Sequence, residues 1–559
     1  MIRKRFFLWR DSYGRINFSM SNPSIKSNPK IIISNSKVND VDVVTVPLPV
    51  EIDNTEKKLN ILHVGAEVTP FSNVGGLSAV IGYLSKALAN RGHDVRIFMP
   101  RFGFIDEKKY KLEVVYKGLK VPTGYTKDEN FPPYLVCNVK KYVTEDNVTV
   151  YFLENMEYYE KRSNVYSYSD DHIRWALLSY GALQFICKNL DWKPDIIHSH
   201  DWHTALVPNI IATKYKKSPC FKDVTTVLTI HNIHFQGKSV DPSSELNFDD
   251  GKSHIPRFYS GRLKRLNYLR RGILYSDLVN TVSEGYSRQI LTREYGGGLD
   301  KLLLELRSKL FGVINGIDYE KFDSKTDPLL PANFDINSIE KRAINKKSLQ
   351  KEFGLKESPD SAMFGFVGRL DQQKGVDLLL EVLEKFLKDF NAQFVLIGSG
   401  DSGYEKSAQK LAKKFPKRVG VHTYPNFTLP KLVFGGADVM LMPSRFEPCG
   451  IVQMESMRYG AVPIVRATGG LDDSVIDFDP ATLEGTGFKF KDFDGWSLYG
   501  QMVRAFETYR DKEVWRQIQK NAMSENFSWT EVALKYEDLY RKAKHFKKGG
   551  FFHEDIFEN

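Results

Sequence analysis

The sequence predicts an α/β protein with two large domains, each built around a mostly parallel β-sheet. The chain has 559 residues, which is too many for a single hydrophobic core. Short apolar runs that are typical of buried strands alternate with amphipathic helical segments in both halves. Polar or Gly-rich turns follow most of these runs. Because ligands bind at the carboxyl ends of parallel strands, two such domains facing each other predict a ligand cleft between them.

Composition and charge exclude several classes of function. Hydrophobic residues make up 42% of the chain and charged residues 26%, which is ordinary for a globular protein. No apolar run approaches the roughly 20 residues that cross a bilayer, so we expect no transmembrane segment. The net charge of +10 comes from Lys and Arg scattered among acids, without nucleic-acid-binding motifs, so no nucleic-acid partner is expected. The four cysteines form no CxxC pair, which predicts a reduced compartment such as the cytoplasm.

Residues 1–58 are predicted to be a variable or disordered N-terminal extension. Up to Lys37 the segment is basic and rich in Ser and Asn, with Asp11 as its only acid. Three interpretations are open: a transit peptide, a disordered bacterial extension, or a start codon assigned too far upstream. A transit peptide would change the expected location from the cytoplasm to the plastid stroma.

The first domain is predicted to span residues 59–315. A strand at residues 59–64 leads into a turn with Gly75 and Gly76, and a helix and a second strand follow, which makes a βαβ unit. Adjacent glycines let backbone approach a ligand closely, although a plain tight turn has the same composition. Polar residues follow two later strands: His198, His200 and Asp201 after one, His231 and Asn232 after the next. These residues predict a polar pocket at one edge of the sheet.

The second domain is predicted to span residues 316–525, with helices over residues 526–559. Arg369 and Lys374 follow a strand directly, where a guanidinium and an ammonium could neutralise a diphosphate leaving group. An ordinary salt bridge at a helix start is the alternative. A leaving group stabilised in this way needs no metal, and we expect none, because the acidic pairs at residues 170–171 and 472–473 lack a Gly-rich ligand loop.

Glu447 is predicted to lie between a strand at residues 439–442 and a helix at residues 451–459. A carboxylate there could hold sugar hydroxyls or stabilise positive charge that develops on a sugar ring. The alternative is that Glu447 only caps the helix.

Nine motifs, in order, resemble those of bacterial glycogen synthases and plant starch synthases, over roughly residues 59–542. The motifs are residues 72–77 (SNVGGL), 198–202 (HSHDW), 231–237 (HNIHFQG), 295–299 (YGGGL), 313–318 (VINGID), 368–375 (GRLDQQKG), 443–450 (PSRFEPCG), 458–460 (RYG) and 466–471 (RATGGL). The resemblance implies a retaining glycosyltransferase of the GT-B fold, with two Rossmann-like domains, an active-site cleft between them, and C-terminal helices that cross back to the first domain. It also implies a nucleotide sugar, ADP-glucose or less often UDP-glucose, as donor and an α-1,4-glucan as acceptor, with no cofactor.

The resemblance implies a role for each matched residue. Catalytic roles fall to Glu447 beside the donor glucose, to Arg369 and Lys374 at the diphosphate, to His200 through its backbone and ring, and to Asp170. Substrate-binding roles fall to Asn73, Gly75, Gly76, Asn232, Gln236, Cys449 and Gly450.

The first-loop motif departs from the family pattern. The family has Lys where this chain has Asn73, and Gly-Asp where it has Ser78 and Ala79. The missing ammonium predicts weaker phosphate binding or a different donor. A glucan-binding homologue with little activity is therefore one alternative function, and another GT-B nucleotide-sugar transferase, of the sucrose or trehalose synthase type, is a second. The oligomeric state is left open.

Overall fold

The computed structural model describes strands β1 and β2 and residues 58–127, 129–188, 191–237, 249–426 and 428–549. It divides into two compact units, residues 1–55 and residues 56–559. In the first unit, β1 (Arg5–Arg10) pairs in antiparallel fashion with β2 (Ile16–Ser21), a pairing that the sequence analysis did not predict. The predicted character of the other residues up to 57 lies outside the described residues.

The second unit contains two β-sheets, and the first of them has nine strands. Their order is β11-β10-β9-β8-β3-β4-β7-β6-β5. The strands are β3 (Asn60–Val64), β4 (Asp94–Pro100), β5 (Glu113–Pro122), β6 (Tyr134–Val143), β7 (Thr149–Glu154), β8 (Ile196–His200), β9 (Thr225–Ile230), β10 (Leu278–Thr281) and β11 (Leu310–Gly312). Every pairing from β11 to β7 is parallel, and β6 and β5 extend the sheet in antiparallel fashion.

The second sheet has six strands, all parallel, in the order β14-β13-β12-β15-β16-β17. The strands are β12 (Ala362–Val367), β13 (Ala392–Ile397), β14 (Val419–His422), β15 (Val439–Met442), β16 (Val462–Arg466) and β17 (Phe488–Phe490). Successive side chains alternate between two apolar layers: Phe394 and Leu396 join one core cluster, and Val395 and Ile397 join the other. Burial on both faces explains why these strands are almost continuously apolar.

Helices cover both sheets. Around the first sheet lie α1 (Gly76–Asn90), α2 (Asp171–Lys188), α3 (Asp201–Thr204), α4 (Leu206–Thr213), α5 (Tyr268–Tyr275), α6 (Glu284–Gln289) and α7 (Asp300–Glu305). Around the second lie α8 (Arg342–Glu352), α9 (Val376–Asp389), α10 (Ser402–Lys414), α11 (Leu429–Gly436), α12 (Val452–Arg458), α13 (Gly469–Ser474), α14 (Gly495–Arg510) and α15 (Lys512–Ser524). Among the described residues, no helix combines the length and the apolarity that a membrane span requires.

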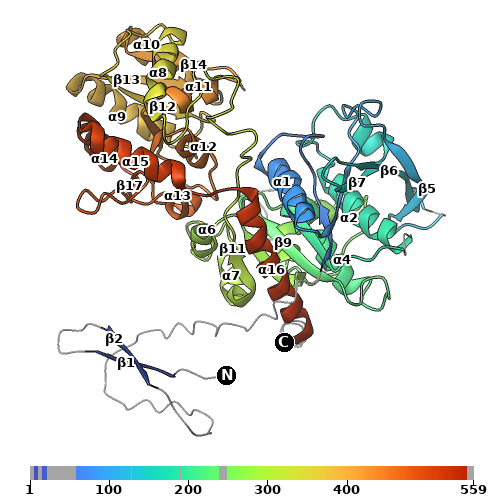
Figure 1. Ribbon diagram of the computed structural model, residues 1–559. Coiled ribbons are helices and arrows are strands. Elements are labelled where there is room, and N and C mark those ends of the chain that lie inside the picture. Colours follow the sequence, from blue (N-terminus) through green and yellow to red (C-terminus); the bar gives the residue numbers. More distant parts are fainter. Residues whose placement is uncertain are drawn as a thin grey trace. The chain divides into compact units, whose positions relative to one another are not determined.

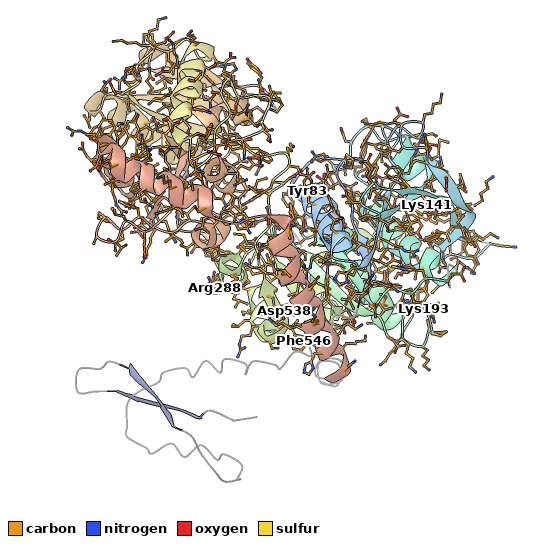
Figure 2. All side chains as sticks on the ribbon, viewed as in Figure 1. Tyr83, Lys141, Lys193, Arg288, Asp538 and Phe546 are labelled. Atoms are coloured by element: carbon orange, nitrogen blue, oxygen red, sulfur yellow. The ribbon has the colours of Figure 1, made fainter. Side chains whose placement is uncertain are left out.

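The last helix, α16 (Trp529–Gly549), packs against the first sheet rather than the second. It contacts α1 and β9 (Figure 1). At its start Trp529 stacks on Tyr83 of α1 with ring centroids 6.4 Å apart, and near its end Phe546 stacks on Phe311 of β11. Tyr83 and Phe546 are labelled in Figure 2.

The order of the parallel strands reverses direction once in each sheet, and this reversal positions the site. In the first sheet β3 lies between β4 and β8, and in the second β12 lies between β13 and β15. Connections that leave β3 and β8, or β12 and β15, turn to opposite sides and leave a crevice at the carboxyl ends of those strands. The fold class predicted from the sequence, two parallel-sheet α/β domains, is confirmed.

Candidate functional site

A cavity of about 700 Å³ is lined by loops from the carboxyl edges of both sheets. The first sheet contributes the loops that follow β3, β8 and β9, and the second contributes the loops that follow β12 and β15. These loops leave both strand-order reversals, so the cavity lies where parallel sheets most often bind ligands. A cavity of this size is within the range for small-molecule and cofactor sites.

The loop between β3 and α1 is shaped by a buried carboxylate. Glu67 Oε2 accepts hydrogen bonds from the backbone N–H groups of Val74, at 2.6 Å, and Gly75, at 3.1 Å. Burial raises the pKa of Glu67. Gly75 and Gly76 line the cavity, and a Cβ on Gly76 would meet no protein atom within 4 Å. The space beside Gly76 is therefore open to a ligand, at the N-terminus of the 15-residue helix α1.

Asp201 ties the loop after β8 to the loop after β9. Its Oδ1 accepts hydrogen bonds from the backbone N–H of His231, at 2.7 Å, and of Asn232, at 3.4 Å. All three residues line the cavity. Asp201 has a φ of +53°, in the left-handed region that non-Gly residues seldom occupy, and burial raises the pKa of its carboxyl to about 7. Of the five residues from which the polar pocket was predicted, Asp201, His231 and Asn232 line the cavity, whereas His198 and His200 are fully buried and do not.

The second-sheet wall carries both cations and the carboxylate that the sequence analysis singled out. Lys374 Nζ lies 2.5 Å from Glu447 Oε2, which also accepts a hydrogen bond from Ser444 Oγ at 3.1 Å. The Arg369 guanidinium lies 2.7 Å from the Asp371 carboxylate and is two-thirds exposed, with 66% of its side chain accessible. Arg369, Lys374 and Glu447 all line the cavity.

Glu447 does not cap the following helix. Helix α12 begins at Val452 with Ile451 as its N-cap, whose side chain makes no capping hydrogen bond, and the Glu447 carboxylate contacts Lys374 and Ser444 instead. The backbone of Glu447 is instead held by the start of α13, because its carbonyl accepts a hydrogen bond from the Gly470 N–H at 3.1 Å. Ser283, which follows β10 of the first sheet, donates to the next carbonyl, that of Pro448, at 2.6 Å. The capping alternative is therefore wrong for this carboxylate.

Eight of the twelve site residues named from the sequence line the cavity. They are Gly75, Gly76, Asn232, Arg369, Lys374, Glu447, Cys449 and Gly450. Asn73, Asp170, His200 and Gln236 are not part of its lining, and each of these four side chains is engaged elsewhere.

Two of these four residues, Asp170 and His200, were named as catalytic, and both differ from their predicted placement. Asp170 pairs with Arg162 at 2.7 Å, and the neighbouring Asp171, the first residue of α2, lines the cavity in its place. His200 is fully buried, and its ring nitrogens contact His63 and His231 at 3.0 and 3.1 Å. Because His200 is fully buried and is not part of the lining, its ring lies behind the cavity wall, where both nitrogens have partners.

Gln236 and Asn73, the other two residues outside the cavity lining, lie in loops. Gln236 donates from Nε2 to the carbonyls of Ile233 and Gly297, at 3.1 and 2.8 Å, and accepts from Asn267 at 2.7 Å, so its amide is fully used in holding two loops together. Asn73 is exposed, and its Oδ1 accepts a hydrogen bond from Ser78 Oγ at 2.6 Å. The departure from the family motif at this position thus lies beside the cavity rather than in its wall.

Several lining residues were not named as site residues from the sequence, among them Glu67, Tyr166, Asp171 and Gln373. Glu67 follows β3 by three residues, so the strand-end argument applied to His200 and Asn232 would have found it. Asp171 was considered only as half of an acidic pair. Tyr166 precedes α2 in an irregular segment, and no pattern in the sequence separates it from the chain's other tyrosines.

Among the described residues, one side-chain group has the spacing of a metal site: His63, His198 and His200, all fully buried. Neither acidic pair considered from the sequence is part of it. Five of the six ring nitrogens in this group already have a hydrogen-bond partner.

Comparisons with known families match most of the second unit. The family described as starch synthase catalytic domain matches residues 60–305, and the family described as glycosyl transferases group 1 matches residues 348–519. A glycogen synthase of Thermotoga petrophila is 40% identical over 496 residues, which covers 87% of this chain and 99% of the relative. Glycogen synthase 1 of Geobacter metallireducens is 38% identical over 493 residues, covering 87% and 96% of the two chains.

Solved structures agree with these matches. The catalytic domain of starch synthase IV from Arabidopsis thaliana, bound to ADP and acarbose, superposes with a TM-score of 0.76 at 30% identity, covering 88% of this chain and all of that one. A sucrose-phosphate synthase from Thermosynechococcus elongatus, at 18% identity and a TM-score of 0.52, shares the fold.

Proposed function

This chain belongs to the glycogen and starch synthase family of glycosyltransferases, and on that basis we propose that it transfers glucose from ADP-glucose to the non-reducing end of an α-1,4-glucan. Glucan synthesis follows from the family; the donor nucleotide and the residue roles are the proposal. The observation that carries it is the cavity wall in which Arg369, Lys374 and Glu447 meet, with the open backbone at Gly76 also in the lining.

Fixed positive charge is the main catalytic device in this proposal. Arg369 and Lys374 bind the diphosphate, and the N-terminus of α1 faces it with backbone N–H groups. Lys374 is held in place by Glu447 before any ligand arrives, so little reorganisation accompanies binding. We propose that no metal takes part, because two cationic side chains already neutralise the leaving group.

Glu447 and the loop after it hold the transferred glucose. The Glu447 carboxylate stabilises positive charge on the sugar, and Cys449 and Gly450 present backbone to its hydroxyls. The bond from C1 to the phosphate oxygen breaks, and the bond from C1 to the acceptor oxygen forms on the same face. Because the acceptor enters on the face that the phosphate leaves, configuration is retained without a covalent enzyme intermediate. The acceptor proton passes to the departing phosphate. Asn232, on the first-sheet side of the cavity, binds the glucose or the acceptor.

A donor assay tests this function. Purified protein is incubated with glycogen and with ADP-glucose or UDP-glucose, and glucose incorporation is measured. We expect incorporation from ADP-glucose at a kcat/KM above that for UDP-glucose. Glycogen binding without incorporation from either donor would instead support the glucan-binding homologue. Transfer to small acceptors such as fructose or glucose phosphates, with none to glycogen, would support the sucrose or trehalose synthase type.

A further inference from the structure

Four histidines occupy one face of the first sheet, in line with the cavity. His63 of β3 is in register with His198 of β8, and His200 follows two residues later on the same face. His231 comes just after β9, two residues beyond Thr229, which is in register with His200. His63, His198 and His200 are fully buried, and the Tyr540 hydroxyl of α16 contacts His198, whereas His231 lines the cavity.

Three of these rings form a continuous hydrogen-bonded chain that ends at the cavity. His63 Nδ1 lies 3.0 Å from His200 Nε2, and His200 Nδ1 lies 3.1 Å from His231 Nε2. Burial lowers the pKa of His63 and His231 to about 3, and that of His200 well below its usual value. Each ring is therefore neutral at pH 7 and carries one proton, so every hydrogen bond in the chain points the same way.

The inner end of the chain fixes that direction. His63 Nε2 is buried and has no hydrogen-bond partner. If the protons pointed inward, this atom would be a buried N–H without an acceptor, which proteins rarely tolerate. If they point outward, His63 Nδ1–H donates to His200, and His200 Nδ1–H donates to His231. His231 is then left with its proton on Nδ1, an atom that has no partner within the described part of the chain.

We propose that His63 and His200 act as positioning residues that hold His231 as an N–H donor to a hydroxyl of the donor glucose. A sugar hydroxyl is the preferred acceptor because the groups proposed for the diphosphate lie elsewhere. Arg369 and Lys374 belong to the opposite wall, and the N-terminus of α1 follows β3, which β8 separates from β9. His231 is also tied by its backbone to Asp201, so both its position and its tautomer are set before the sugar binds. This role rests on the proposed donor, ADP-glucose.

A double-mutant cycle tests the chain. His63→Phe keeps a ring but removes the Nδ1–H, and His231→Phe removes the donor itself. Each single variant is expected to lose about two- to tenfold in kcat/KM for ADP-glucose, with the affinity for ADP alone unchanged. In the double variant the His63 change should cost nothing further, because it acts only through His231. Full additivity of the two losses, or an equal loss of ADP affinity, would overturn the proposal.

Two further variants separate positioning from packing. His63→Asn, which retains an amide donor near the Nδ1 position, should recover most of the activity lost in His63→Phe. His198→Phe is equally buried on the same face but lies outside the chain, so its effect should be the same in the wild-type and His231→Phe backgrounds. If His63→Asn is as impaired as His63→Phe while both unfold at the same temperature, the chain does not set the activity.

A measurement that needs no donor sugar distinguishes this inference from the proposed function. In ¹⁵N-histidine-labelled protein, solid-state NMR reports whether the His231 proton is on Nδ1 or Nε2, with the signal assigned by its loss in His231→Phe. We expect the Nδ1–H tautomer in wild type and a mixture in His63→Phe. The Nε2–H tautomer in wild type would overturn the chain whatever donor the enzyme uses. Stoichiometric zinc that is lost in His63→Phe would overturn it as well, in favour of a metal site at His63, His198 and His200.

Discussion

Lys374 Nζ lies 2.5 Å from Glu447 Oε2 although 73 residues separate them in the chain. The contact exists because β12 and β15 are neighbours in the second sheet, so the loops that leave their carboxyl ends meet at the strand-order reversal. Lys374, which is proposed to bind the leaving diphosphate, therefore contacts Glu447, which is proposed to stabilise the sugar.

Glu447→Gln should separate transfer from nucleotide binding. The amide keeps the shape and the Ser444 contact but loses the charge, so kcat should fall by about a hundredfold, or about 3 kcal/mol. The affinity for ADP should not fall, because Lys374 is released from its partner. Isothermal titration with ADP and the glucose-incorporation assay measure the two effects. Asp377→Asn, which breaks the Arg445 pair at 2.7 Å outside the cavity lining, is the matched control. A Glu447→Gln variant with wild-type kcat would remove this residue from the mechanism.

Asn73→Lys should tighten donor binding. Asn73 is exposed beside the loop of Gly75, so a lysine there adds an ammonium near the proposed diphosphate site without displacing buried atoms. We expect KM for ADP-glucose to fall by up to about tenfold, or about 1.4 kcal/mol, with the gain shrinking at high salt. Initial-rate kinetics at two ionic strengths measure this change. Asn73→Met has a similar length but no charge, and it should leave KM unchanged; the same gain in both variants would exclude the electrostatic explanation.

Gly470→Ala should disturb the Glu447 loop from outside the cavity. A Cβ at Gly470 would overlap the Cys449 carbonyl oxygen, so the backbone there must move. We expect a loss of stability of about 1–3 kcal/mol, together with a fall in kcat. Gly500→Ala, in the exposed part of α14 where no atom lies within 4 Å, should be neutral or stabilising by up to about 1 kcal/mol. Thermal unfolding and the transfer assay compare the two variants. If Gly470→Ala and Gly500→Ala had the same stability and the same kcat, the Glu447 loop would tolerate the backbone shift.

Stability should fall when the pH drops below the ordinary histidine pKa of 6.5. Four buried histidines, His63, His198, His200 and His203, and the partly exposed His231 have pKa values lowered by desolvation. Between the folded and the unfolded pKa values the unfolded chain binds more protons at these sites, so acid favours unfolding. Asp201 and Glu455, with pKa values raised to about 7 and about 8, act in the opposite direction but are fewer.

Chemical denaturation of wild type and His198→Phe between pH 7.5 and 5.5 checks this prediction. Removing one titrating histidine should reduce the slope of the unfolding free energy against pH by up to about 1.4 kcal/mol per pH unit. An unchanged slope would show that burial does not keep His198 neutral in the folded protein.

The sequence alone determined the fold class and most of the second-sheet wall. Alternating apolar runs and helical periodicity are local patterns, and they located β12, β15 and the residues that follow them, including Arg369, Lys374 and Glu447. The strand-end argument also predicted a polar pocket that includes Asn232, because parallel strands end at the same edge, and the family resemblance implied Gly75 and Gly76 at the same site.

Only the tertiary structure decided which of two adjacent side chains lines the cavity, and which side chains pair across it. Asp171 rather than Asp170 is part of the lining, and His200 lies behind His231, because these choices depend on the start of α2 and on the register of β3, β8 and β9. Register is a contact between segments far apart in the chain. The amino-acid pattern within any one segment favours a strand but does not choose its neighbour, and the neighbour is what brings His63 to His200 and Lys374 to Glu447.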